Sequence, residues 1–108
     1  MHLVICSQGL DLSQGTKEAA ERRLRFVLGR FGTRIRRATA YVTKDKTSPS
    51  GLNNQCRIMV SLRPSGQVVV EVADKNVQTV LKHAAERIGP AISRELTWRH
   101  QPRSAVSG

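Results

Sequence analysis

The residues best suited to chemistry in this chain are cations, and they are concentrated in one segment. Residues 17–46 hold ten Lys and Arg against Glu18, Glu21 and Asp45, which leaves a local charge of +7. A surface helix that carries cations for solubility normally interleaves comparable numbers of acids, and this segment does not. Arginine outnumbers lysine thirteen to five in the whole chain, and its planar guanidinium can donate two hydrogen bonds at once to a phosphate. The segment therefore favours nucleic acid or another polyanion as the partner.

The side chains that could bind a metal are scattered along the chain. His2, His83 and His100 show no i, i+4 spacing, and no carboxylate stands in a ligand pattern beside them. Cys6 and Cys56 lie fifty residues apart and form neither a CxxC pair nor a disulfide framework. We therefore expect no metal site, and we interpret both cysteines as small buried hydrophobic residues.

Motifs of enzymes are equally absent from the sequence. No GxSxG, GxxxxGKS or HExxH string occurs. Asp74 and Glu86 are explained more simply as a helix cap and as the intrahelical partner of Lys82 than as an acid and base pair. We expect no catalytic residue, no cofactor and no enzymatic activity, although a small enzyme of unknown type is kept as a remote alternative.

Length and composition describe one small domain. The chain has 108 residues, a net charge of +10 and 39% hydrophobic residues, enough for one core without metals or disulfides. No apolar run approaches the ~18 residues of a membrane span, and no signal-peptide h-region follows Met1. We expect a cytoplasmic protein with no membrane partner, a single domain over residues 1–100 and a flexible tail over 101–108.

Hydropathy patterning predicts six elements in the order β-α-β-β-β-α. An apolar run over 2–6 predicts a buried strand, and Ser13 is a plausible N-cap for a helix that runs to Phe31 and stops at Gly32. Alternation over 35–43, 55–62 and 67–73 predicts three more strands. The stretch 45–54, rich in Ser, Pro, Gly and Asn, is typical of a long hairpin connection, and 63–66 is typical of a tight turn.

The last predicted element is a second helix. Asp74 and Asn76 are its candidate N-caps, and apolar residues recur at spacings of three and four as far as Ile92. A proline in a helix interior costs about 3 kcal/mol, so we expect a kink or a restart at Gly89-Pro90. This order of elements predicts an α+β fold, in which both helices pack on one face of a four-stranded, mostly antiparallel sheet.

The predicted helices group many of the cations. At about 100° per residue, Arg22 and Arg25 share one exposed side of the first helix, while Arg23 and Arg30 border its apolar stripe. A surface that joins the two helices could follow a phosphate backbone. Trp98 either stacks on a base or, more often for a lone Trp, covers an edge of the core. The candidate contacts are Lys17, Arg22, Arg23, Arg25, Arg30, Arg36, Arg37, Lys82, Arg87, Arg94 and Arg99.

Several local strings resemble the ribosome hibernation promoting factor family, which includes ribosome-associated inhibitor A and is also labelled sigma-54 modulation protein. The segment 9–13 is similar to the family's glycine, hydrophobic, Thr approach to the first helix. Lys17, the pair Arg22-Arg23 and Phe31 fall on its basic and aromatic positions. The string NVQTVLKHAAERI over 76–88 is similar to the opening of its last helix. The joint order and spacing of these strings carry the resemblance.

The resemblance implies a fold akin to double-stranded RNA-binding domains. It further implies that basic residues of the helices contact rRNA in the decoding region of the small ribosomal subunit, with ribosomal proteins as further partners. Translation would then be blocked and idle ribosomes preserved during stress. A regulatory module whose basic face binds an acidic protein is the alternative from a different class.

Overall fold

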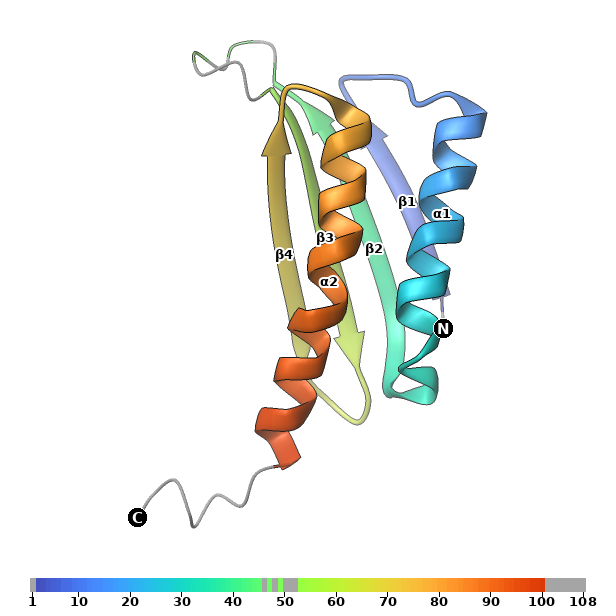
Figure 1. The fold of residues 1–108 in the computed structure, drawn as a ribbon, viewed down its shortest axis with the longest axis vertical. Helices are drawn as coiled ribbons and strands as arrows, with labels where there is room; N and C mark the ends of the chain where they lie inside the picture. The colour runs from blue at the N-terminus through green and yellow to red at the C-terminus, as the bar shows by residue number, and fades with distance from the viewer. Residues whose placement is uncertain (1, 46, 48, 50–52, 101–108) are drawn as a thin grey trace.

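A computed structural model of the chain describes residues 2–45, 47, 49 and 53–100. Residues 98–100 are described by their backbone alone. Seven elements follow one another along the chain (Figure 1). They are β1 (His2–Gln8), α1 (Gln14–Gly29), a short 3-10 turn η1 (Gly32–Arg34), β2 (Ile35–Lys44), β3 (Asn54–Leu62), β4 (Gln67–Asp74) and α2 (Val77–His100). The expected tail over 101–108 lies outside the described residues.

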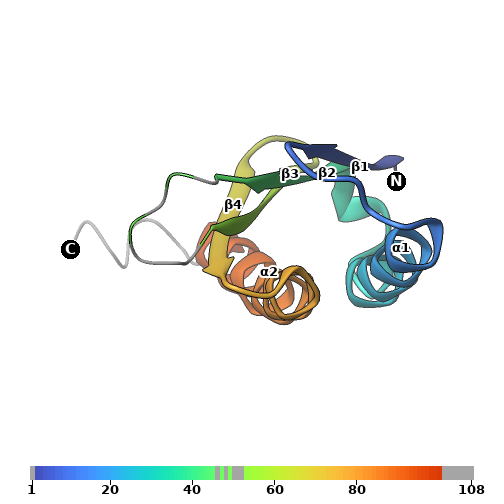
Figure 2. The same cartoon turned by 90° about the horizontal axis from the view of Figure 1, so that it is seen from above.

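The four strands form one mixed sheet in the order β1-β2-β3-β4. β1 runs parallel to β2, and the other two pairs are antiparallel. Both helices pack on the same face of the sheet, and the opposite face is left open (Figure 2). The expected α+β fold, with a mostly antiparallel sheet and two helices on one face, is confirmed.

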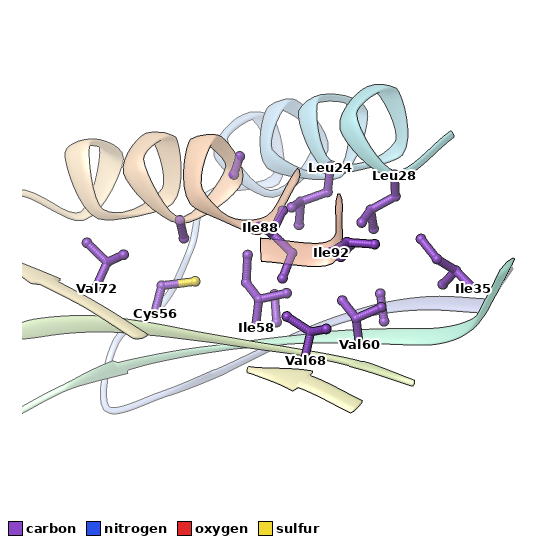
Figure 3. Close-up of a cluster of buried hydrophobic side chains, with 14 of the residues drawn as sticks. Leu24, Leu28, Ile35, Cys56, Ile58, Val60, Val68, Val72, Ile88 and Ile92 are labelled. Carbon is purple, nitrogen blue, oxygen red and sulfur yellow. The ribbon is translucent and has the colours of Figure 1, made fainter. Parts of the chain in front are cut away.

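The core lies between the sheet and the helices and follows directly from the alternation of the strands. Ala38, Ala40 and Val42 of β2 are fully buried, alternate residues of β3 are buried with them, and Val68 and Val72 of β4 are buried while Val70 between them is half-buried. Figure 3 shows Leu24 and Leu28 of α1 and Ile88 and Ile92 of α2 pointing down onto these strands. Burial of a side chain of this size contributes roughly 1.5–3 kcal/mol, so this single layer holds both helices in fixed positions on the sheet.

A β-bulge at the start of β2 changes which residues face outward. Ile35 and Ala38 are three residues apart, so a regular strand would point them to opposite faces of the sheet. Both are buried, because the register with β3 shifts between Ile35 and Arg37. One extra residue is accommodated there, and Arg36 and Arg37 are both exposed as a result. The alternation predicted from Ile35 onward is therefore right from Arg37 to Thr43, while Ile35 itself lies on the core side.

Capping side chains fix the start of both helices. The Ser13 hydroxyl accepts a hydrogen bond from the Thr16 N–H at 3.1 Å, and the Asn76 carboxamide oxygen accepts from the N–H groups of Gln78 and Thr79 at 2.8 and 3.2 Å. The prediction of Ser13 is confirmed, and of the two candidates for α2 it is Asn76 that caps the helix, while the Asp74 carboxylate accepts from the Asn76 N–H at 3.1 Å. α1 ends at Gly29, before the predicted end at Phe31, because the chain tightens there and Phe31 N–H donates to the Leu28 carbonyl.

α2 runs unbroken through Gly89-Pro90, so of the two expected outcomes the restart is wrong and the kink stays a prediction. Pro90 is exposed, whereas Ala85, Ile88 and Ile92 on either side of it are buried. The apolar burial on both sides of the proline exceeds the ~3 kcal/mol that the lost hydrogen bond and the ring clash cost. Tertiary packing therefore maintains the helix against its local preference.

The two cysteines have different environments. Cys56 is buried on the helix-facing side of β3, and burial raises the pKa of its thiol to about 11. Cys6 is exposed, and it pairs in register with Tyr41, so it lies on the open face of the sheet. The expectation of a buried Cys6 is wrong, because the edge strand β1 is covered by helices on one face only.

Candidate nucleic-acid interface

The two helices lie side by side and run in the same direction, with their N-termini at the same end of the molecule (Figures 1 and 2). An open groove of about 660 Å³ separates their first turns. Parallel helices add their dipoles, so the positive ends of both lie at this groove. Residues from both helices line it: Ser13, Gly15, Thr16, Ala19, Ala20 and Arg23 from the α1 side, and Gln78, Thr79, Leu81 and Lys82 from α2.

Arg23 and Lys82 give the groove its charge. They come from different helices and both are exposed. Hydroxyl and amide groups of Ser13, Thr16 and Gln78 lie around them. The groove therefore offers two cations, neutral hydrogen-bonding groups and two helix N-termini to one partner, and this combination suits the phosphates of a nucleic-acid backbone.

Arg30 belongs to the same side of α1, about 20° around the helix from Arg23. Its guanidinium lies over the Phe31 ring, 5.3 Å from the ring centroid. A Cβ at Gly89 would come within 3.2 Å of Arg30 Nη2 and of Val27 Cγ1, so glycine at this position is what allows the two helices and the guanidinium to approach. Gly89, which the sequence indicated only as a helix breaker, therefore positions a cation beside α2.

Arg25 lies apart from this groove. It is about 200° around α1 from Arg23, and its Nη2 pairs with Glu21 Oε1 at 3.0 Å. The charge of Arg25 is thus already balanced on the flank away from α2. Arg22 lies between these two sides, and Lys17 is exposed in the first turn of the helix.

The two adjacent arginines of the bulge are also separated from the groove. Arg37 faces the open side of the sheet, opposite the core position of Ala38. Arg36 Nη2 donates to the Pro64 carbonyl at 3.4 Å, next to the β3–β4 turn. These arginines belong to the sheet, so one flat partner surface on the helices would not reach Arg37.

On α2, the predicted contacts fall on two flanks. Arg87 and Arg94 are exposed and about 20° apart, but they lie about 120–140° around the helix from Lys82, on the flank away from α1. The side chains of Trp98, Arg99 and His100 lie outside the described residues. Of the predicted contacts, the structure therefore brings together Arg23, Arg30 and Lys82, with Arg22 beside them.

The sequence analysis did not predict the exposure of Phe26. Phe26 is 85% exposed, and it lies on the side of α1 that faces away from the stripe of Ala20, Leu24 and Leu28. The signal was present, because a large apolar residue outside a helical apolar stripe has no core to enter.

Metal and membrane sites are not found in the described part of the chain. Among residues 2–45, 47, 49 and 53–100, no three His, Cys, Asp or Glu side chains gather into a group that could hold a metal ion. Neither helix is long and apolar enough within these ranges to cross a membrane.

Comparison with known proteins gives a likeness in structure alone. Neither a family model nor a curated protein matches the sequence. The structure is similar to a ribosomal subunit interface protein from Coxiella burnetii, with a TM-score of 0.75 and 17% identity over 90% of this chain and 99% of that one. It is also similar to the N-terminal domain of Thermus thermophilus Protein Y, with a TM-score of 0.69 and 18% identity over 87% of this chain and 98% of that one. The chain has the fold of these two proteins.

Proposed function

We propose that this protein is a ribosome-associated hibernation factor that binds rRNA of the small ribosomal subunit through its basic helical face. The observation that carries the proposal is the convergence of Arg23, Arg30 and Lys82 from two parallel helices, in a fold shared with a ribosomal subunit interface protein. The sequence strings that resemble the hibernation family support the same assignment. A ribosome-associated role implies that the protein acts in the cytoplasm, where ribosomes translate.

The proposed mechanism is occupancy. Cations fixed along two helices hold a phosphate backbone in register without reading its bases. A domain bound across the messenger and transfer RNA sites of the small subunit would exclude both ligands and leave the ribosome idle but intact. This mechanism requires no catalytic group, and it assigns none of the histidines or carboxylates a chemical role.

The strength of binding should depend steeply on salt. If Arg22, Arg23, Arg30 and Lys82 each neutralise one phosphate, the slope of log affinity against log salt is about −2.8 to −3.6. A rise from about 50 to 200 mM salt would then weaken binding by about 50- to 150-fold. Neutral contacts alone would give almost no such dependence.

Co-sedimentation tests the proposal. The purified protein is run with bacterial ribosomes, and separately with isolated small subunits, on sucrose gradients at about 50 and 200 mM salt. The proposal predicts stoichiometric binding to the small subunit that is lost at the higher salt. Absence of binding at low salt, together with binding to an acidic protein, would instead favour the protein-interaction module.

A further inference from the structure

Phe26 is exposed far beyond the other large apolar residues of the described structure. Its exposure is 85%, against 43% for Tyr41 and 44% for Val69, both on the open face of the sheet. Burying a phenylalanine side chain is worth roughly 1.5–3 kcal/mol, and this residue gains almost none of it within its own chain. The ring is therefore available to a partner.

Two arginines lie on the turn of α1 that precedes Phe26. Arg22 and Arg23 precede Phe26 by four and three residues, so both lie next to it on the surface of α1, whereas the Arg30 guanidinium lies over the Phe31 ring and beside Gly89. Side chains of a helix lean toward its N-terminus, which places the ring over the turn that carries Arg22 and Arg23. The Phe26 patch, defined here as Phe26 with Arg22 and Arg23, thus joins one aromatic face to two cations.

The chemistry of the Phe26 patch selects its partner. A second copy of this chain, which carries a net charge of +10, would bring like charges together across the contact. A nucleotide matches both parts of the patch, because its base has a flat face that stacks on an aromatic ring and its phosphates pair with arginine. The faces of bases inside an A-form helix are covered by stacking on their neighbours, so a base that stacks on Phe26 must be unpaired.

We propose that Phe26 stacks on an unpaired base of the bound RNA, with the flanking arginines on the adjacent phosphates. This inference rests on the proposed function and goes beyond it, because it adds a base contact to an interface otherwise made of phosphate contacts. It also assigns the aromatic contact to α1 rather than to Trp98.

Affinity for small ribosomal subunits tests the contact. Phe26→Ala should weaken binding by about 5- to 150-fold, the range measured when one base–aromatic stack is removed. Phe26→Trp should bind at least as tightly as the wild type, whereas Phe26→Leu should remain at least about fivefold weaker, because a branched aliphatic chain has no face on which to stack. Val69→Ala removes an exposed apolar side chain from the opposite face and should leave the affinity unchanged.

Salt dependence separates this inference from the proposed function. Phe26→Ala should lower affinity at every salt concentration with an unchanged slope, since no phosphate contact is lost. If wild-type binding is steep in salt and Phe26→Ala has no effect, the stacking contact is wrong while the proposed function stands. If the wild type does not bind small subunits at all, the proposed function fails, and the inference fails with it.

The kind of partner is identified by crosslinking. Phe26→p-benzoyl-phenylalanine keeps an aromatic ring at the position and forms a covalent bond to its neighbour under light. A crosslink to an rRNA nucleotide in the small-subunit complex is the expected result. A crosslink to a ribosomal protein or to a second copy of the chain, or full binding by Phe26→Leu, would overturn the proposal.

Discussion

Neutralising the two cations of the groove should reduce the salt dependence of ribosome binding by about half. In the double variant Arg23→Gln and Lys82→Gln, two of the four expected phosphate contacts are lost, and the slope becomes shallower by about 1.4–1.8. The loss of affinity between about 50 and 200 mM salt should then fall from about 50- to 150-fold to about 7- to 12-fold. Both side chains are exposed, so the fold should be unaffected.

The chain offers a control of equal charge. Arg25→Gln with Arg57→Gln also removes two positive charges, but Arg25 pairs with Glu21 on the far flank of α1, and Arg57 pairs with Glu71 at 3.2 Å on the sheet. Exposed pairs of this kind contribute about 0–1 kcal/mol to stability, so this variant should also stay folded. Its salt slope should match that of the wild type.

Fluorescence anisotropy measures these slopes. A dye attached to the exposed Cys6 reports on binding from the open face of the sheet, on the far side of the sheet from the groove. Titration with small subunits at several salt concentrations gives the slope for each variant, and thermal unfolding confirms that each is folded. An equal decrease in salt slope in both double variants would show that total charge governs binding, and would rule out the groove between the helices as the rRNA-binding surface.

Three further predictions concern the scaffold of the site. Ser13→Ala removes the N-cap of α1 and should lower the free energy of unfolding by about 1 kcal/mol in urea titration; no change would mean that the hydroxyl is not needed for capping. Gly89→Leu should lower it by about 1–3 kcal/mol, because even a Cβ at this position lies 3.2 Å from Val27 Cγ1; an equally stable variant would show that the helices can separate freely. A maleimide reagent should modify Cys6 in the native protein and Cys56 only after unfolding.

The buried thiol also predicts how stability depends on pH. The pKa of Cys56 rises from an ordinary value of 9.0 to about 11 in the folded protein. Between these values the unfolded chain has released the thiol proton while the folded chain retains it, so the unfolded state becomes favoured as pH increases. The contribution is fully present below about pH 9 and is lost as pH rises toward 11. Replacing Cys56 with Ala should remove this part of the pH dependence in denaturant titrations.

The order of the elements was predictable because local signals agree with the fold. Strand alternation, the Ser13 and Asn76 caps and the spacing of three and four in both helices all point to the observed arrangement. Tertiary contacts decide the two places where local signals mislead, the restart that was one of the outcomes expected at Gly89-Pro90 and the burial expected of Cys6. Pro90 stays inside a helix because its neighbours are buried against the sheet, and Cys6 is exposed because the helices cover one face of β1 only.

The site was predicted less completely than the fold. Charge density in the sequence identified the cations but could not tell which of them share a surface. Only the packing of two parallel helices shows that Arg23 and Lys82 line one groove, while Arg25 is held by Glu21 and Arg37 lies on the sheet. A helical projection alone could have found Phe26, because that residue falls outside the apolar stripe of α1.

The orientation of the protein on the small ribosomal subunit distinguishes binding through the two helices from binding through the sheet. Electron cryo-microscopy of the small ribosomal subunit bound to this protein would show which face meets the rRNA. We expect α1 and α2 to lie against rRNA, with Arg23 and Lys82 at phosphates and the open face of the sheet turned away. A complex in which the open face of the sheet meets the rRNA and the groove between the helices faces solvent would contradict this expectation.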